Sequence, residues 1–161
     1  MISELSASDF ERILEIINDA AEAYKGVIPD DRWHEPYMSE DELREEVDSG
    51  IRFYGWFEAS VPVGVMGIQI VRDATLIRHA YVLTKHQRRG IGSKLVEYLI
   101  DLAETTKILV GTWNDAVWAI DFYEKHGFRI TPPDEKNRLL REYWDVPERQ
   151  IETSVVLKLE R

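Results

Sequence analysis

The sequence predicts an α/β (α+β) fold in a single domain that spans residues 1–161. Three observations lead to this class. Two amphipathic helical segments come first, three consecutive segments with strand character follow, and a strand-helix-strand-helix unit comes after them. A chain of 161 residues with 44% hydrophobic residue types can build one substantial core, and it is too short for two ordinary domains.

The first third of the chain predicts two helices. Ser8 and Asp9 offer an N-cap for a helix that should stop at Gly26, and its apolar positions keep helical spacing: Ile13, Ile16, Ile17, Ala20 and Tyr24. Ser39 and Glu42 form a capping box for a second helix, which should end near residue 50. Residues 27–39, between the two helices, read as an irregular loop rich in aromatic and polar groups.

The remainder of the chain alternates between strand and helix patterns. Residues 52–59, 63–72 and 75–83 predict an antiparallel meander, with a turn at residues 60–62. A crossover unit follows. Its first helix has an apolar side formed by Ile91, Leu95, Leu99 and Leu102. A strand at 107–113 comes next, and then a helix from about 115 to 126 that ends at Gly127. Residues 128–131 and 151–159 add two strands, separated by a charged, proline-interrupted insert at 132–150.

The formal net charge of -10 is concentrated in the first third. Residues 1–50 hold 15 Asp and Glu against 4 Lys and Arg, whereas residues 51–161 hold 15 against 16. Nucleic acid is an unfavourable partner, because binding it requires a basic surface. The acidic third could meet a cationic substrate, or its carboxylates could simply be the solvated faces of two surface helices.

Composition narrows the remaining classes. The chain has no cysteine, which removes disulfides, cysteine-based zinc sites and a cysteine nucleophile. Its first residues are acidic, whereas a signal peptide would begin with basic residues. Its longest uncharged run, residues 59–71, contains proline and glycine and is shorter than the ~20 residues of a membrane span. We therefore expect a cytoplasmic protein without a membrane partner. The four histidines are not spaced as ligands, so no metal is expected.

The stretch HQRRGIGSKLVEYLI, residues 86–100, places two arginines and two glycines before a helix. A helix N-terminus offers unpaired N–H groups to an anion, and Gly90 and Gly92 would leave that backbone open while Arg88 and Arg89 add positive charge. The loop lacks the Gly-Lys-Ser/Thr of a P-loop and the third glycine of a dinucleotide fingerprint. A phosphate-binding loop and a purely structural turn both fit these residues.

The segment YVLTKHQRRGIGSKL closely resembles the acyl-CoA motif of the GNAT superfamily of N-acetyltransferases, Q/R-x-x-G-x-G/A between a strand and a helix. The segment AIDFYEKHGF, residues 119–128, resembles the second signature of that family. The order of predicted elements is also similar over nearly the whole chain. The resemblance implies a mixed, mostly antiparallel sheet of about seven strands flanked by four main helices, and acetyl-CoA as co-substrate.

The resemblance implies a cofactor site on two segments. The CoA pyrophosphate would lie on the backbone of residues 88–93, and the pantetheine arm would pair with the end of the preceding strand, where a backbone N–H polarises the thioester carbonyl. The implied cofactor-binding residues are Tyr81, Val82, Leu83, Gln87, Arg88, Arg89, Gly90, Ile91, Gly92 and Ser93. The substrate amine would attack the thioester directly, without an acyl-enzyme intermediate.

Two residues are candidates for proton transfer. Tyr123 matches the tyrosine that protonates the departing thiolate in this family, although a tyrosine in such a helix could also be a core residue. His79 stands where some members have a glutamate base, with a satisfied strand histidine or a water chain as alternatives. In a regular strand His79 would share a face with Tyr81, and Arg78 would point the other way. The asparagine of many members is absent, because position 116 is alanine.

The acceptor side is less defined by the sequence. The resemblance places it largely on the first two helices and their connection, where Trp33, Glu35 and Tyr37 could form a pocket for an amine or belong to an ordinary packed loop. The favoured function is an N-acetyltransferase acting on a primary amine, as a monomer or homodimer. A CoA-binding regulatory module that has lost catalysis and a structural domain without a CoA site are the alternatives.

Overall fold

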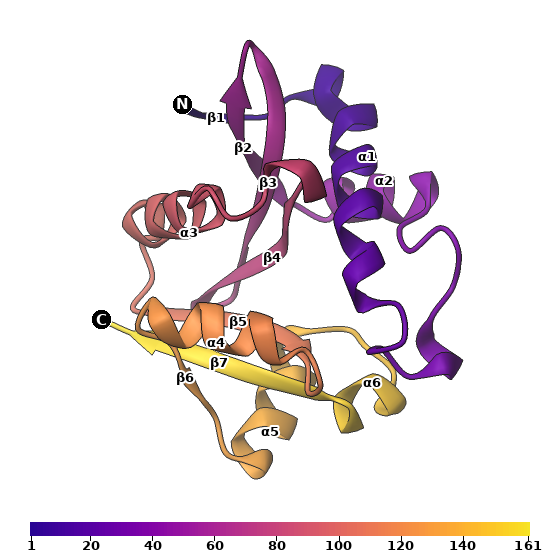
Figure 1. Cartoon of the computed structure of the whole chain (residues 1–161). Helices are drawn as coiled ribbons and strands as arrows, with labels where there is room; N and C mark the ends of the chain where they lie inside the picture. Colours follow the sequence, from indigo (N-terminus) through magenta and orange to yellow (C-terminus); the bar gives the residue numbers. More distant parts are fainter.

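A seven-stranded sheet forms the centre of the protein in a computed structural model that describes all residues 1–161 (Figure 1). The strand order is β1-β2-β3-β4-β5-β7-β6. The strands are β1 (Ile2–Glu4), β2 (Arg52–Glu58), β3 (Val61–Val71), β4 (Ala74–Val82), β5 (Lys107–Trp113), β6 (Arg129–Ile130) and β7 (Ser154–Glu160). β4 and β5 pair in parallel and all other neighbours are antiparallel. The predicted α/β (α+β) class with a mixed, mostly antiparallel sheet is confirmed.

The two helices of the first third lie where the sequence predicts them. α1 (Phe10–Ala20) continues into a 3₁₀ turn (Ala21–Tyr24) and ends before Gly26, whose φ is 85°. α2 (Glu40–Asp48) begins at Ser39, whose hydroxyl accepts the backbone N–H of Glu42 at 3.1 Å. The short edge strand β1 was not predicted, because three residues are too few to show an alternating pattern.

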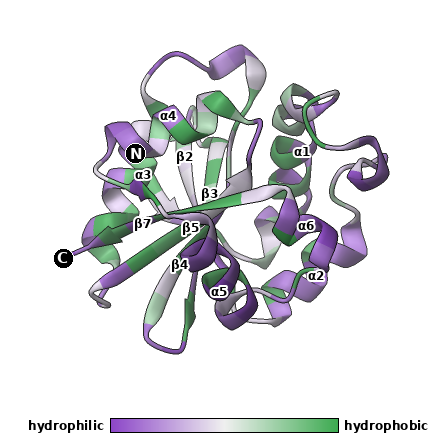
Figure 2. Cartoon of the chain, turned by 90° about the horizontal axis from the view of Figure 1, so that it is seen from below, coloured by the Kyte–Doolittle hydropathy of each residue, from purple (hydrophilic) through white to green (hydrophobic).

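The helices cover both faces of the sheet. α3 (Ile91–Leu102) and α4 (Val117–Lys125) lie on one face, and α1 and α2 lie on the other (Figures 1 and 2). α3 buries Ile91, Leu95 and Leu99 as its pattern predicts, whereas Leu102, in its last turn, is exposed. Gly127 ends α4 with a φ of 92°, as expected for a glycine C-cap. No helix of the protein has the length and apolar character of a membrane span.

The insert between the last two strands contains two helices that were not predicted. α5 (Pro133–Tyr143) and α6 (Glu148–Glu152) pack against β7, and because α6 takes up residues 148–152, β7 begins at Ser154 instead of residue 151. A separate apolar cluster lies beneath them, formed by Ala74, Leu76, Leu109, Leu139, Leu140, Tyr143, Ile151 and Val156. The sheet is therefore flanked by the four main helices that were predicted and by these two.

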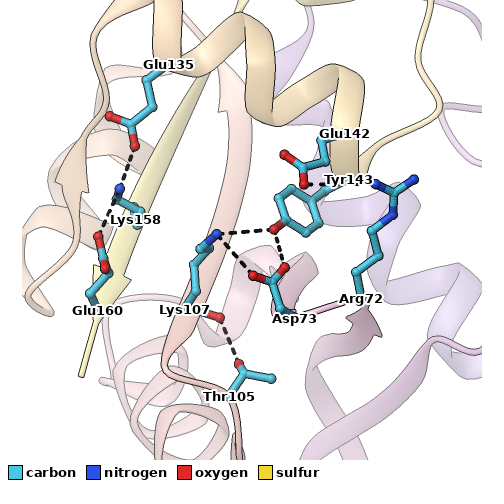
Figure 3. Close-up of polar contacts among 9 residues, drawn as sticks. All are labelled: Arg72, Asp73, Thr105, Lys107, Glu135, Glu142, Tyr143, Lys158 and Glu160. Atoms are coloured by element: carbon cyan, nitrogen blue, oxygen red, sulfur yellow. Dashed lines mark hydrogen bonds and ion pairs between the residues drawn. The ribbon is translucent and has the colours of Figure 1, made fainter.

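Polar contacts at both ends of α5 fix it to the sheet (Figure 3). At its end, the Tyr143 hydroxyl donates to the Asp73 carboxylate, and Nζ of Lys107 lies 3.2 Å from the same hydroxyl. At its beginning, Glu135 accepts from Nζ of Lys158 on β7 at 2.5 Å. These contacts fix α5 beside the paired ends of β4 and β5, where Ala74 lies opposite Lys107.

Candidate active site

The parallel strands β4 and β5 separate halfway along their length. Their pairing covers residues 74–77 of β4 and ends where Ile77 faces Val110. Next to this point β4 has a bulge, seen as a register shift against β3 and a φ of 56° at His79. Around the bulge, Arg78, Tyr81 and Val82 remain paired with β3, and no residue of 78–82 has a partner on β5. The sheet therefore opens, and one backbone edge of β4 faces the opening.

A large cavity of about 640 Å³ lies on the open part of β4. Its walls come from the end of α1, from β3 and β4, from the loop that begins α3, and from α4, and most of its lining is apolar. Tyr81, Val82, Gln87, Arg88 and Gly92 of the predicted cofactor residues line it. The large cavity therefore brings together the strand and the loop that the sequence singled out.

A hollow beside the large cavity is lined by three further residues of the predicted loop, Gly90, Ile91 and Ser93. The backbone N–H groups of residues 88–90 donate to no backbone carbonyl, and helical hydrogen bonding starts with Lys94 N–H to Gly90 C=O at 3.1 Å. Gly90 has a φ of 76° and Arg88 a φ of 66°, which turn the chain sharply before α3. The unpaired N–H groups make this loop a site where an anion can bind.

Two predicted cofactor residues lie outside both cavities. Leu83 is buried in the core, and its N–H donates to the carbonyl of Val63 at 2.9 Å. The guanidinium of Arg89 is held by Glu58 at 3.2 Å and lies near the His86 ring. These contacts leave Arg88 as the arginine that lines the cavity.

A small cavity of about 140 Å³ lies between the separated parts of β4 and β5. Several tyrosine and tryptophan side chains line it, and the insert contributes Trp144 and Gln150 among others. Four residues line both the small and the large cavity, namely Tyr24, Ala80, Tyr81 and Tyr123. The opening in the sheet is thus reached from two sides, and the two sides meet at these four residues.

Tyr123 lies at this junction on α4, with its ring packed edge-on against Phe122 and Phe128. Burial, and to a lesser degree the neighbouring Tyr24, raise the pKa of Tyr123 well above its ordinary value. The phenol is therefore protonated at neutral pH and able to act as an acid. The residue is also part of the main core, as the alternative interpretation of the sequence predicts.

His79 lines the small cavity and contacts a carboxylate from α2. Its Nε2 meets Oε2 of Glu46, and the guanidinium of Arg78 lies 3.3 Å from the other carboxylate oxygen. His79 and Arg78 therefore lie on the same side of the sheet, and the prediction that Arg78 points the other way is wrong. The bulge is the reason, because its extra residue interrupts the alternation of side chains along β4.

Comparison with known proteins agrees with this geometry. The model of the acetyltransferase (GNAT) family matches residues 10–128. The chain belongs to the GNAT acetyltransferase family. A search of curated protein sequences found no match.

Several solved GNAT structures share the fold. The PaiA N-acetyltransferase of Thermoplasma acidophilum, solved with coenzyme A, has a TM-score of 0.73 at 20% identity and covers 100% of this chain and 98% of its own. The ribosomal-protein-S18-alanine N-acetyltransferase of Escherichia coli has a TM-score of 0.70 at 18% identity, covering 99% and 92%. A GNAT acetyltransferase of Elizabethkingia anophelis with acetyl-CoA bound has a TM-score of 0.66 at 23% identity, covering 100% and 97%. These similarities show the fold.

The three predicted acceptor residues of this GNAT protein differ in how close they lie to the opening. Tyr37 lines the small cavity, and Trp33 packs against Tyr37 with ring centroids 5.8 Å apart. Glu35 is exposed and lies 3.2 Å from Nζ of Lys25, whose hydrogen bond lowers the pKa of that carboxyl. Tyr37 is the one of the three that lines the small or the large cavity.

Sequence reasoning missed several residues around the opening. Tyr24 was assigned only to an apolar helix face, yet burial and the adjacent Tyr37 raise the pKa of this tyrosine to about 12, with a smaller lowering by the Thr112 hydroxyl. Glu46 belongs to an acidic helix, EDELREEVD, in which nothing separates it from surface carboxylates. The apolar spacing of Leu139, Leu140 and Tyr143 could have revealed α5.

No group of three or more His, Asp or Glu side chains could hold a metal ion.

Proposed function

We propose that this GNAT acetyltransferase moves the acetyl group of acetyl-CoA directly to a primary amine while both substrates are bound. The observation that supports this proposal most is the meeting of two cavities at Tyr24, Ala80, Tyr81 and Tyr123. A donor in the large cavity and an acceptor in the small one would approach each other at this junction. Two-sided access of this kind suits a direct transfer, which needs both reactants in contact.

The donor would use the loop and the open strand edge. The unpaired N–H groups of residues 88–93 suit the CoA pyrophosphate, and Arg88 adds positive charge beside them. The free edge of residues 78–82 can accept the pantetheine arm as an added strand, because no β5 residue pairs with it. This arrangement would bring the thioester to Tyr81, next to the hydroxyl of Tyr123.

The reaction would proceed in two steps. The amine nitrogen forms a bond to the thioester carbon, and the resulting tetrahedral oxyanion is stabilised by a backbone N–H of β4. The carbon–sulfur bond then breaks, Tyr123 donates its proton to the departing thiolate, and His79 or a water chain takes the proton that the amine loses. The products are the N-acetylated amine and CoA, and no acyl-enzyme intermediate forms.

The acidic first third supports a cationic amine as acceptor. Tyr24 and Tyr37 of this part of the chain line the small cavity, and the field of its excess carboxylates attracts positively charged molecules. A CoA-binding module without catalysis is the second candidate. It is favoured by Ala116, which stands where many family members have asparagine.

A panel of amines and amino acids tests the proposal. Release of free CoA from acetyl-CoA, measured with each acceptor, should identify at least one amine that is turned over. Propionyl-CoA and butyryl-CoA measured in parallel would define the preferred donor. Tight acetyl-CoA binding without turnover of any amine would favour the binding module, and absence of CoA binding would refute both.

A further inference from the structure

Glu46 occupies an unusual position for a residue of an acidic surface helix. Its side chain is 23% exposed, and its two carboxylate oxygens contact different cations of β4. One oxygen meets His79, and the other lies 3.3 Å from Arg78, which is also held by Gln69 at 3.1 Å. α2 thus places a carboxylate against the bulge that opens the sheet.

The contact with Glu46 decides which nitrogen of His79 is available. A neutral imidazole carries one N–H and one lone pair, and a carboxylate can only accept a hydrogen bond. Because Nε2 meets the carboxylate, the proton of the neutral ring belongs on Nε2. The lone pair is then on Nδ1, which has no protein partner and belongs to a side chain that lines the small cavity.

Glu46 is ionised at neutral pH despite its surroundings. Burial raises the pKa of this carboxyl, but the close contact and charge of His79, followed by the charge of Arg78, outweigh burial and lower the pKa below its ordinary value. A permanently charged acceptor holds the imidazole in one orientation and stabilises the imidazolium that forms when the ring takes a proton.

We propose that Glu46 is a positioning residue for the acetyl transfer, which holds His79 with its Nδ1 lone pair toward the small cavity. The proposal rests on the proposed function, with His79 and not a water chain as the acceptor of the proton that the attacking amine loses. In the reaction, the N–H bond of the amine breaks, the proton moves to Nδ1, and the positive charge of the ring is balanced by the Glu46 carboxylate. A purely structural role, the neutralisation of Arg78, is the alternative.

Kinetics of three variants distinguish the two roles. Glu46→Gln, His79→Gln and the double variant are compared in the full chain with acetyl-CoA and the best amine of the panel. We expect Glu46→Gln to lower kcat about 10-fold or more, without a change in KM for acetyl-CoA. The double variant should have the kcat of His79→Gln alone, because Glu46 acts only through His79. Independent, multiplicative losses, or wild-type kcat in Glu46→Gln, would overturn the proposal.

Glu45→Gln is the matched control. Glu45 is exposed on the same helix and forms no ion pair, so the same change of charge there should leave kcat unchanged. Thermal unfolding of each variant shows whether a loss of activity reflects a loss of fold.

A measurement on the unmodified protein keeps the proposal testable if the variants do not fold. Nitrogen NMR of the imidazole rings, with the His79 signals assigned by their loss in His79→Gln or by ring-to-ring contacts with Phe53, distinguishes the two neutral tautomers. We expect the Nε2–H tautomer at high pH, and the Nδ1–H tautomer would refute the proposal. The tautomer of His79 is measured without turnover, so this experiment distinguishes failure of the Glu46 proposal from failure of the proposed function.

Discussion

Nε2 of His126 lies 3.0 Å from Oγ of Ser93, which joins the end of α4 to the first turn of α3. The His126 side chain is nearly buried, its ring packs on Phe122, and its Nδ1 lies 3.7 Å from Glu97. The hydrogen bond holds the Ser93 side chain beside the loop that we assign to the CoA pyrophosphate. The two segments that resemble the GNAT motifs are therefore in direct contact.

Ser93→Ala should weaken CoA binding about 10-fold, because a hydrogen bond to a charged group contributes roughly 1.5 kcal/mol or more. It should also destabilise the free protein by about 1 kcal/mol, since it leaves Nε2 of the buried His126 without its partner. Titration calorimetry measures the first effect and thermal unfolding the second. His126→Phe is the matched control, because it keeps the ring packing and leaves the Ser93 hydroxyl in place. Equal CoA affinity in Ser93→Ala and wild type would show that the hydroxyl does not reach the ligand.

Gly92 provides a second test of the loop. A Cβ at this position would lie 3.5 Å from the ring of Phe122, which is an ordinary contact, so Gly92→Ala should fold and still bind CoA. Gly92→Glu should abolish binding, because it places a carboxylate beside the unpaired N–H groups. A ligand at 100 times its dissociation constant adds about 2.7 kcal/mol, which corresponds to a rise of roughly 5–10 °C in the wild-type Tm. A wild-type Tm that does not move at saturating CoA would refute the anion site.

Tyr123→Phe tests the proposed acid. In water the pKa of a thiol is about 8.5 and that of a tyrosine about 10, so proton transfer to the thiolate costs roughly 2 kcal/mol there. Burial raises the pKa of Tyr123 further, but it disfavours the departing thiolate as well, so a thiolate held out of water beside the hydroxyl should recover much of this cost. Removal of the hydroxyl should lower kcat about 100-fold, with little change in stability or CoA affinity because the packed ring remains. Rapid-mixing kinetics measure the chemical step. Full activity would mean that another group or a water protonates the thiolate.

The acidic first third leads to a prediction about the acceptor. If its field attracts the substrate, a cationic amine should be preferred to a neutral or acidic one, and its apparent affinity should fall with added salt. The reason is screening, because the Debye length shortens from about 10 Å at 0.1 M to roughly 3 Å at 1 M. Steady-state kinetics at several salt concentrations, with a neutral amine as control, measure the effect. A best acceptor with net negative charge would exclude this role for the carboxylates.

The contact between Tyr143 and Asp73 leads to a prediction about the insert (Figure 3). Tyr143→Phe should destabilise the fold by about 1 kcal/mol at pH 7, because it removes the hydroxyl that contacts Asp73 and Lys107. The hydrogen bond from Tyr143 lowers the pKa of the Asp73 carboxyl below its unfolded value, which is about 3.9. The difference in the free energy of unfolding between wild type and variant should therefore persist at neutral pH and decrease below about pH 4, as the carboxyl takes up a proton. Denaturant unfolding at several pH values measures it, and a difference independent of pH would contradict the role of Asp73.

Local patterns in the sequence determined most of the fold. The helical spacing of Ile13, Ile16 and Ile17 and the cap at Ser39 predicted α1 and α2, since short-range hydrogen bonds and the burial of one helix face depend on neighbouring residues. Gly90 and Gly92 predicted the loop for the same reason, because the conformational freedom of a residue without a Cβ is a local property of the backbone. The insert shows how such signals are lost, since its prolines and charges concealed the apolar face of α5.

Only the tertiary structure decided the arrangement of the site. The positive φ of His79 is a property of the pairing between β3 and β4, because no glycine or turn residue marks a bulge there. The contact between Glu46 and His79 joins residues on different elements, and Glu46 looks like its exposed neighbours in the sequence. The convergence of Tyr24, Tyr81 and Tyr123 likewise depends on where α1, β4 and α4 pack. Contacts between segments far apart in the chain depend on the packing of the whole sheet, and a single sequence carries no local signal for them.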